Sequence, residues 1–273
     1  MKNYLKKNWS TVLLIVAFTV GLSLLLYPTV ANWWNSFHTA QAVASYDEAV
    51  AQMNALDLEL MLADAQKYNE DLLKENNRYF PSEEMHKRYE SILNVSGDGM
   101  IGTVNIPSVH VNLGIYHGTD EKLLQSKVGH IEGSSLPVGG PSTHCVISGH
   151  RGLPSAKLFT DIVKLKEGDV FMLRVLGKTL TYEVDQIRTV LPAEVNDLEI
   201  VPGEDLVTLV TCTPYGINSH RMLIRGHRIA NLPDDMTTQD ASLFDRNLVA
   251  IGIAVVVLIG LMAWIFLKDR FVK

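Results

Sequence analysis

The chain has 273 residues, of which 47% are hydrophobic and 20% are charged, and its formal net charge is −6. These averages are those of an ordinary globular protein, so the distribution along the chain is more informative than the mean. The acidic balance and the lack of basic clusters argue against a nucleic acid as partner. The sequence has no metal-ligand spacing and no phosphate-binding glycine loop, so we expect neither a metal nor another cofactor.

Two uncharged, apolar segments lie near the two ends of the chain. Residues 11–28 and 248–267 are each long enough for a membrane-spanning helix, which needs about 17 to 25 residues. Lysines precede the first segment and follow the second, and positive flanks stay on the cytoplasmic side of a membrane. We therefore expect cytoplasmic tails at residues 1–10 and 268–273, with the region between the spans outside the cell.

Each apolar segment also has another interpretation. The first could be a cleaved signal peptide, since Thr29-Val-Ala31 loosely resembles a small-residue cleavage site. Trp33 and Trp34 favour an uncleaved anchor, because tryptophan gathers at membrane interfaces. The second could be a buried core helix, although its length of 20 residues and its basic flank favour a span. In each case the region between them is exported.

Residues 29–96 are predicted to form a helical region. Residues 40–76 are rich in Ala, Leu, Met, Glu and Gln, with apolar residues at helical spacing. Pro81 ends this helix, and Ser82 followed by two glutamates is typical of a new helix start. The simplest role for such a region is a spacer that lifts the next domain off the membrane.

From residue 97 to residue 232 the pattern changes to short β-branched runs separated by Gly, Pro, Asn and Asp. This density of short strands predicts a closed or nearly closed β-barrel rather than alternating βαβ units. A short crossover helix is expected at residues 158–165, and a polar linker at residues 233–247 leads to the second span. The expected strands are residues 101–106, 109–116, 128–131 (the weakest), 145–148, 170–176, 180–190, 207–212 and 222–229.

A cysteine ends one of these strands, in Thr208-Leu-Val-Thr-Cys212, and a Pro/Gly/Asn turn then leads to Arg221 on the next strand. A thiol is a strong nucleophile only as the thiolate, which needs a positive charge and a proton partner nearby. Arg221 is a candidate for the charge. The other cysteine, Cys145, lies inside an apolar run, and we interpret it as a small buried residue rather than as a disulfide partner.

Nine histidines compete for the role of proton partner. His150 lies at a strand-to-loop boundary, where functional side chains are often presented by a rigid scaffold. His220 adjoins Arg221, but strand alternation groups it with Met222 and draws it toward the core. We therefore favour His150 over His220, although each residue taken alone also has an ordinary structural interpretation.

At these positions the sequence resembles the sortase family of cysteine transpeptidases, and especially its pilus-assembling class C branch. The Thr-Leu-x-Thr-Cys strand ends at Cys212, and an arginine follows nine residues later, at Arg221. The Gly-His-Arg context of the family's catalytic histidine matches His150, 62 residues before the cysteine. The resemblance covers residues 97–230 and implies a mainly β fold, the eight-stranded sortase barrel, with two flanking membrane spans.

This resemblance also implies a mechanism. Cys212 would cleave a Leu-Pro-x-Thr-Gly sorting signal between Thr and Gly through a thioacyl intermediate, while His150 transfers protons and Arg221 stabilises the oxyanion. An amine then takes over the acyl group. In class C enzymes this amine is a pilin lysine, and in a wall-anchoring sortase it belongs to a peptidoglycan precursor. Substrate contacts are expected at Leu209, Thr211 and Tyr215.

Class C enzymes usually carry a lid with an Asp-Pro-aromatic motif just before the barrel. This chain contains no Asp-Pro dipeptide and has Asn76-Asn-Arg-Tyr-Phe-Pro81 at that place. Tyr79 and Phe80 are therefore candidate lid anchors. The alternative is that these aromatic rings simply pack on the barrel.

Two other functions fit parts of the sequence. A wall-anchored surface protein also has a Leu-Pro motif, an apolar span and a basic tail, but no Thr-Gly pair follows Leu232-Pro233 here. A secreted cysteine protease would use the same thiol with water as acceptor. The reactivity of the Cys212 thiol tests the first alternative, because a surface protein needs no activated cysteine, and product analysis with and without an amine tests the second.

Overall fold

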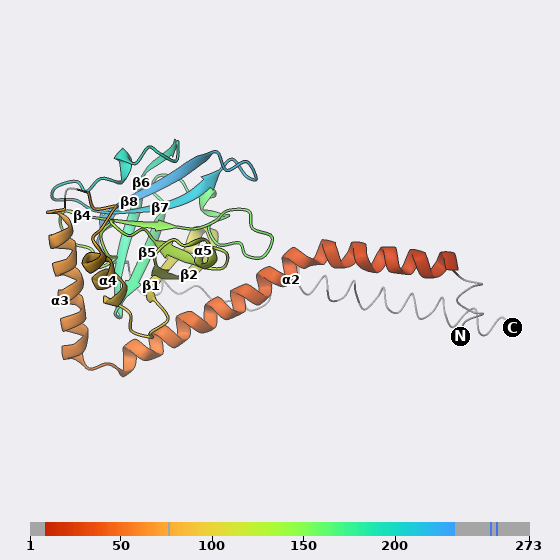
Figure 1. Cartoon of the computed structure of the whole chain (residues 1–273), viewed down its shortest axis with the longest axis horizontal. Coiled ribbons are helices and arrows are strands. Elements are labelled where there is room, and N and C mark those ends of the chain that lie inside the picture. Colours follow the sequence, from red (N-terminus) through yellow and green to blue (C-terminus); the bar gives the residue numbers. More distant parts are fainter. Residues whose placement is uncertain (1–8, 76, 233–251, 253–254, 256–273) are drawn as a thin grey trace. The chain divides into compact units, whose positions relative to one another are not determined.

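The computed structural model describes residues 9–75 and 77–232, together with residues 252 and 255 (Figure 1). Residues 1–8 of the expected N-terminal tail, the expected linker at residues 233–247 and the C-terminal tail lie outside the described residues. The second expected span also lies outside them, apart from those two single positions.

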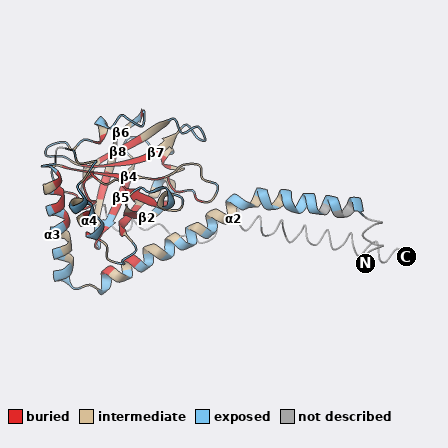
Figure 2. Cartoon of the chain, viewed as in Figure 1, coloured by how far each residue is buried: buried red, intermediate tan, exposed pale blue. Residues whose placement is uncertain are grey.

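The described residues begin with one long helix, α2 (Trp9–Gln52), of 44 residues. It is the one helix among the described residues that is long and apolar enough to cross a membrane, and no residue of its most apolar window is buried (Figure 2). Pro28 lies inside α2, although a proline removes one backbone donor and crowds the preceding turn. The expected boundary between span and helical region at residue 28 is therefore not a break in the helix.

Two shorter helices follow, α3 (Ala55–Leu72) and α4 (Glu83–Ser91). The sequence predicts an unbroken helix over residues 40–76, which is wrong at Asn54, because the Asn54 side chain caps α3 by accepting from the Asp57 N–H at 2.8 Å. The predicted helix start at Ser82 is confirmed, since its hydroxyl accepts from the Met85 N–H at 3.2 Å.

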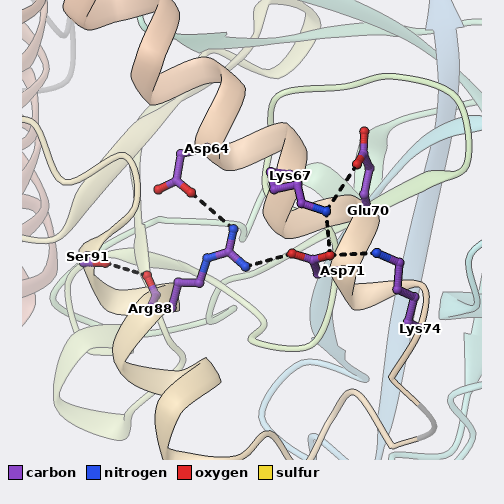
Figure 3. Close-up of polar contacts among 7 residues, drawn as sticks. All are labelled: Asp64, Lys67, Glu70, Asp71, Lys74, Arg88 and Ser91. Atoms are coloured by element: carbon purple, nitrogen blue, oxygen red, sulfur yellow. Dashed lines mark hydrogen bonds and ion pairs between the residues drawn. The ribbon is translucent and has the colours of Figure 1, made fainter.

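A charged network joins α3 to α4 (Figure 3). Arg88 on α4 donates to Asp71 at 3.0 Å and to Asp64 at 3.2 Å, both on α3. Asp71 also accepts from Lys74 and Lys67, at 2.8 and 2.9 Å. These hydrogen bonds lower the pKa of Asp71, that from Lys74 most of all, so the carboxylate stays charged and keeps the two helices together.

The predicted eight-stranded barrel is confirmed. Its strands follow the order β1-β2-β3-β4-β7-β8-β6-β5, and β1 also pairs with β5, which closes the barrel. The expected crossover helix at residues 158–165 is wrong, because that stretch forms only a single 3₁₀ turn, η2 (Ile162–Lys164). The strands are β1 (Met100–Ile106), β2 (Val111–His117), β3 (Val128–His130), β4 (Thr143–Ser148), β5 (Val170–Val175), β6 (Lys178–Val190), β7 (Asp205–Thr213) and β8 (His220–Ile229); the minor helices are α5 (Glu121–Leu124), η1 (Pro107–Val109) and η3 (Asn196–Leu198).

Strands β4, β7 and β8 are packed on both faces (Figure 2). Every second residue of these strands, such as Leu209 on β7 and Ile224 on β8, points inward and belongs to the large cluster that fills the barrel. Their neighbours face outward and form a second cluster under the β6–β7 loop, residues 191–204. This outer cluster consists of Val146, Val190, Leu198, Val210 and Leu223, with Ile131 at its border.

The last turns of α2 are fastened to the barrel by Tyr46, which is 1% exposed. Its hydroxyl accepts from the Leu176 N–H at 3.1 Å and donates to the Ile101 carbonyl at 3.4 Å. Nearer the apolar half of α2, the Asn32 side chain accepts from the Lys157 N–H at 2.9 Å. The same helix that is apolar enough to cross a membrane thus contacts the barrel directly.

Candidate active site

Strand β7 carries Cys212 to the mouth of the barrel, and β4 runs parallel beside it. The register pairs Ser148 with Val210, and the Gly149 N–H donates to the Val210 carbonyl at 3.0 Å. His150, the next residue, therefore leaves β4 at the level where Cys212 approaches the end of β7. The fold brings these two residues together from positions 62 residues apart in the chain.

On the other side of β7, the antiparallel strand β8 pairs Arg221 directly with Cys212. One guanidinium nitrogen of Arg221, Nη1, donates to the carbonyl oxygens of Asn218 and His220, both at 3.1 Å. A guanidinium has five N–H donors, so the bonds from this single nitrogen occupy only part of the fork. The β7–β8 turn thus holds a fixed positive charge next to the thiol-bearing residue.

Strand alternation decides which way these residues face. Cys212 lies two residues after Val210 and therefore faces the same side of the sheet, and Arg221 likewise faces the same side as Leu223. Val210 and Leu223 both belong to the outer cluster. His220 has the parity of Met222, which packs against the barrel interior, as the sequence predicts. Arg221 and Cys212 therefore share the outer face of the barrel, under the β6–β7 loop.

The two cysteines differ in accessibility, and both are free thiols. Cys212 is partly exposed, whereas Cys145 is 3% exposed and belongs to the cluster that fills the barrel. Burial raises the pKa of the Cys145 thiol strongly, because an apolar interior disfavours the thiolate. The prediction that Cys145 is a small buried residue without a disulfide partner is confirmed.

His130 is the histidine most deeply enclosed in the barrel wall, at 0% exposure. Its Nε2 donates to the Ser135 carbonyl at 2.8 Å, and its Nδ1 accepts from the Tyr89 hydroxyl at 2.9 Å. Burial lowers the pKa of His130 to about 4. Both ring nitrogens are thus occupied, and His130 ties α4 to the barrel rather than facing an open site.

Two of the three expected substrate contacts need correction. Leu209 is 0% exposed and faces the barrel interior, so it cannot touch a bound peptide. Thr211 is 1% exposed, and its hydroxyl donates to the Gly149 carbonyl at 2.8 Å, so its contacts are internal. Tyr215, in contrast, is 61% exposed and lies near the Arg151 guanidinium, whose carbon is 5.8 Å from the ring centroid.

The candidate lid segment, of which residues 77–81 are described, rests on the β6–β7 loop. Arg78 donates to the Leu198 carbonyl at 3.1 Å and to the Glu199 carboxylate at 2.9 Å. The Tyr79 hydroxyl donates to the same Leu198 carbonyl at 3.3 Å. Phe80 makes no comparable contact and is 79% exposed. Sequence reasoning chose the two aromatic residues and missed Arg78, which forms the strongest contacts.

A polar cluster beneath the β6–β7 loop, buried at His144 and Thr208 and partly exposed at Arg225 and Asp185, was also missed. His144 on β4 contacts Thr208 on β7, and Arg225 on β8 forms a two-bond ion pair with Asp185. All four side chains lie on the outer face, below the outer cluster. Among the described residues, no group of three or more His, Cys, Asp or Glu side chains could hold a metal ion.

Comparison with known proteins identifies the family. Residues 104–229 match the model of the sortase domain. Sortase C1 from Streptococcus agalactiae is 46% identical and superposes with a TM-score of 0.68, covering 70% of this chain and 100% of that structure. Clostridium perfringens sortase C, solved with a C-terminal cell wall sorting motif, is 40% identical with a TM-score of 0.62, covering 70% and 100%.

A sequence relative supports the same assignment. Sortase A from Streptococcus agalactiae is 32% identical over 117 residues, which are 42% of this chain and 47% of that protein. The chain therefore spans about half the length of this relative. By sequence and by structure, this chain belongs to the sortase family of cysteine transpeptidases, and the solved structures that it resembles include class C sortases.

Proposed function

We propose that this sortase cleaves a Leu-Pro-x-Thr-Gly sorting signal between Thr and Gly and joins the new acyl end to a pilin lysine. The observation that carries the proposal is the strand register. It pairs Cys212 with Arg221 across β7 and β8, and it brings His150 to the same level from β4. A nucleophile, a fixed cation and a titratable ring thus meet at one end of three adjacent strands.

Each residue supplies a different part of the reaction. The Cys212 thiolate attacks the Thr carbonyl carbon and forms a tetrahedral oxyanion, which the Arg221 guanidinium stabilises. The C–N bond then breaks, and His150 gives its proton to the leaving glycine amine. A lysine amine loses a proton to His150, attacks the thioester and releases the Cys212 thiolate, so one amide bond replaces another.

Cys145 and His130 do not suit this chemistry. The Cys145 thiol is enclosed in the barrel, where burial raises its pKa and favours the unreactive neutral form. His130 is fully buried, with both ring nitrogens hydrogen-bonded. A peptide substrate could reach neither side chain without opening the barrel, whereas Cys212 is partly exposed at its mouth.

The sorting-signal partner and the location at the membrane are proposed on similar grounds. A sorting motif is present in the structure of Clostridium perfringens sortase C, which supports a sorting signal as substrate. The apolar helix α2 suits a membrane anchor, and its lysine-rich N-terminal flank favours a cytoplasmic N-terminus with the barrel outside the cell. A peptidoglycan-precursor amine remains the alternative acceptor, in which case the enzyme anchors proteins to the wall.

Polymerisation of a purified pilin precursor by the full chain in detergent tests the proposal. We expect a ladder of linked subunits on denaturing gels with wild type and with Cys145→Ala, and none with Cys212→Ala. A ladder from Cys212→Ala would refute the assignment. Release of hydrolysed monomers alone, even with a pilin that offers lysines, would indicate a protease, and linkage only to a peptidoglycan-precursor amine would indicate wall anchoring.

A further inference from the structure

The β6–β7 loop is fastened to the barrel wall by one histidine, His144 on β4. Its Nδ1 lies 2.8 Å from the Glu199 carbonyl oxygen, and its Nε2 lies 2.7 Å from the Thr208 hydroxyl oxygen on β7. A carbonyl can only accept, so Nδ1 carries the hydrogen and donates to Glu199, while Nε2 accepts from Thr208. One neutral imidazole thus links two barrel strands to the loop.

The backbone of His144 is itself hydrogen-bonded, and its side chain is buried. His144 is 1% exposed; its backbone N–H donates to the Ser135 hydroxyl at 3.0 Å, and its carbonyl accepts from the Ser135 N–H at 2.9 Å. Burial lowers the pKa of His144, and the positive charge of Arg225 lowers it further. The neutral ring, with both of its hydrogen bonds, therefore persists at neutral pH.

The same point of the loop is also held by Arg78. Its guanidinium bonds to the Leu198 carbonyl and to the Glu199 carboxylate, and the Arg78 side chain is only 11% exposed. The Glu199 carboxylate is 60% exposed, so its ion pair is weakened by solvent. The bond to the backbone of Leu198 is the more sheltered half of this contact. Residues 198 and 199 are thus clamped between β4 and the candidate lid segment.

The clamped point lies on the outer face of the barrel that also carries Cys212. Leu198 is 7% exposed and packs in the outer cluster with Val210 and Leu223. Val210 lies two residues before Cys212 on the same face of β7. A displacement of Glu199 should therefore move Leu198 and reshape the surface beside the thiol.

We propose that His144 is a positioning residue for the sortase reaction, which fixes the β6–β7 loop through Glu199 and so shapes the surface that receives the sorting peptide. Arg78 is the second contact of the same clamp. The inference rests on the proposed function and deepens it by naming what holds the β6–β7 loop in place. His144 touches neither the thiol nor the substrate, so it acts on binding rather than on the chemical step.

Steady-state cleavage of a Leu-Pro-x-Thr-Gly peptide by the full chain in detergent tests this inference. The rate at which a small thiol reagent labels Cys212 is measured in parallel. For His144→Leu we expect KM to rise about tenfold, with kcat and the rate of thiol labelling within about threefold of wild type. His144→Gln restores both a donor and an acceptor, and should recover most of the KM. A folded His144→Leu enzyme with wild-type KM, or with reduced kcat at unchanged KM, would overturn the proposal.

The clamp has a matched control on the same loop. Arg188 forms an exposed ion pair with Asp197 at 2.7 Å, so Arg188→Met removes a loop contact of the same chemical kind at another point. Arg78→Met should raise KM and Arg188→Met should not; equal effects would contradict a clamp at residues 198 and 199.

If His144→Leu fails to fold, Thr208→Val is the substitute, because it removes the hydrogen bond between Thr208 and the His144 ring. It should still raise KM, and an unchanged KM in this variant would also overturn the inference. If the wild-type enzyme does not cleave the peptide at all, the result would instead count against the proposed function.

Discussion

The hydroxyl of Thr211 donates a 2.8 Å hydrogen bond to the carbonyl oxygen of Gly149. Each of these residues immediately precedes a proposed catalytic residue, Cys212 in one case and His150 in the other. The backbone ladder between β4 and β7 ends at Ser148 and Val210, so this side-chain bond extends the pairing one step further toward the site. The bond therefore fixes where Cys212 and His150 lie relative to each other along the two parallel strands.

Removing that bond should impair catalysis without abolishing it. Thr211→Val keeps the shape but leaves a buried carbonyl unpaired, which should destabilise the fold by about 1 kcal/mol and lower kcat/KM roughly tenfold. Thr211→Ser keeps the hydroxyl and should retain most of the activity. Peptide cleavage and thermal unfolding of both variants measure the effect, and equal kcat/KM for valine and wild type would show that the ladder alone aligns the site.

The fixed charge of Arg221 should not be replaceable by another cation. Arg221→Lys keeps the charge but loses the planar fork, so we expect kcat to fall at least a hundredfold, as when an oxyanion donor is removed. His150→Ala should be similarly impaired. His220→Ala is the control, because its side chain has the parity of the barrel interior and should act mainly on stability. A folded but inactive His220→Ala enzyme beside an active His150→Ala enzyme would reverse the assignment.

The candidate lid segment should restrain access to Cys212 through Tyr79 and not through Phe80. Tyr79 is half-buried and contacts the β6–β7 loop, whereas Phe80 is 79% exposed. Tyr79→Ala should therefore speed labelling of Cys212 by a thiol reagent, roughly fivefold if about 1 kcal/mol held the segment closed. The double variant Tyr79→Ala/Phe80→Ala should match the single one, and Phe80→Ala should match wild type. Unchanged labelling in a folded Tyr79→Ala enzyme would mean that the ring only packs on the loop.

Acid should destabilise the barrel through His130. Burial lowers the pKa of His130 to about 4, while the unfolded chain binds the same proton near pH 6.5. Between these values the unfolded state holds more protons, so stability is full above about pH 6.5 and falls as the pH drops toward 4, by about 3 kcal/mol in all. His117 and His144, whose pKa values are also lowered by burial, add losses in the same direction.

Denaturant unfolding of wild type and His130→Gln, followed by circular dichroism at pH 7 and pH 4.5, measures this contribution. The variant should be less stable at pH 7 but lose less stability on acidification. Parallel losses in the two proteins would assign the acid sensitivity to other groups.

Local signals predicted the barrel well, because its strands are short and separated by Gly, Pro and Asn turns. They could not predict the contacts of His144 or Arg78, which reach partners 64 and 121 residues away. Such distances are set by the closure of the barrel and leave no local pattern. The break at Asn54 was missed because alanine- and leucine-rich flanks favour helix on both sides of the cap.

The misplaced substrate contacts have a different cause. Six consecutive residues of β7, from 206 to 211, are buried, so the strand reads as one continuous apolar run. Without alternation the sequence does not tell which face fills the barrel and which lies under the loop. Leu209 and Thr211 have the parity of the interior, and Cys212 has the opposite one. The packing in the folded barrel, with Leu209 inside and Val210 in the outer cluster, resolves the two faces.

The closure of the sheet has a consequence for how this enzyme can change its target. Because β1 also pairs with β5, none of the eight described strands lies at an open edge where a peptide could add itself to the ladder. Selectivity then resides in side chains and in the loops between strands, which tolerate variation better than the strands do. Grafting another β6–β7 loop should alter the preferred signal while the barrel keeps its stability, so the scaffold and the specificity can evolve separately.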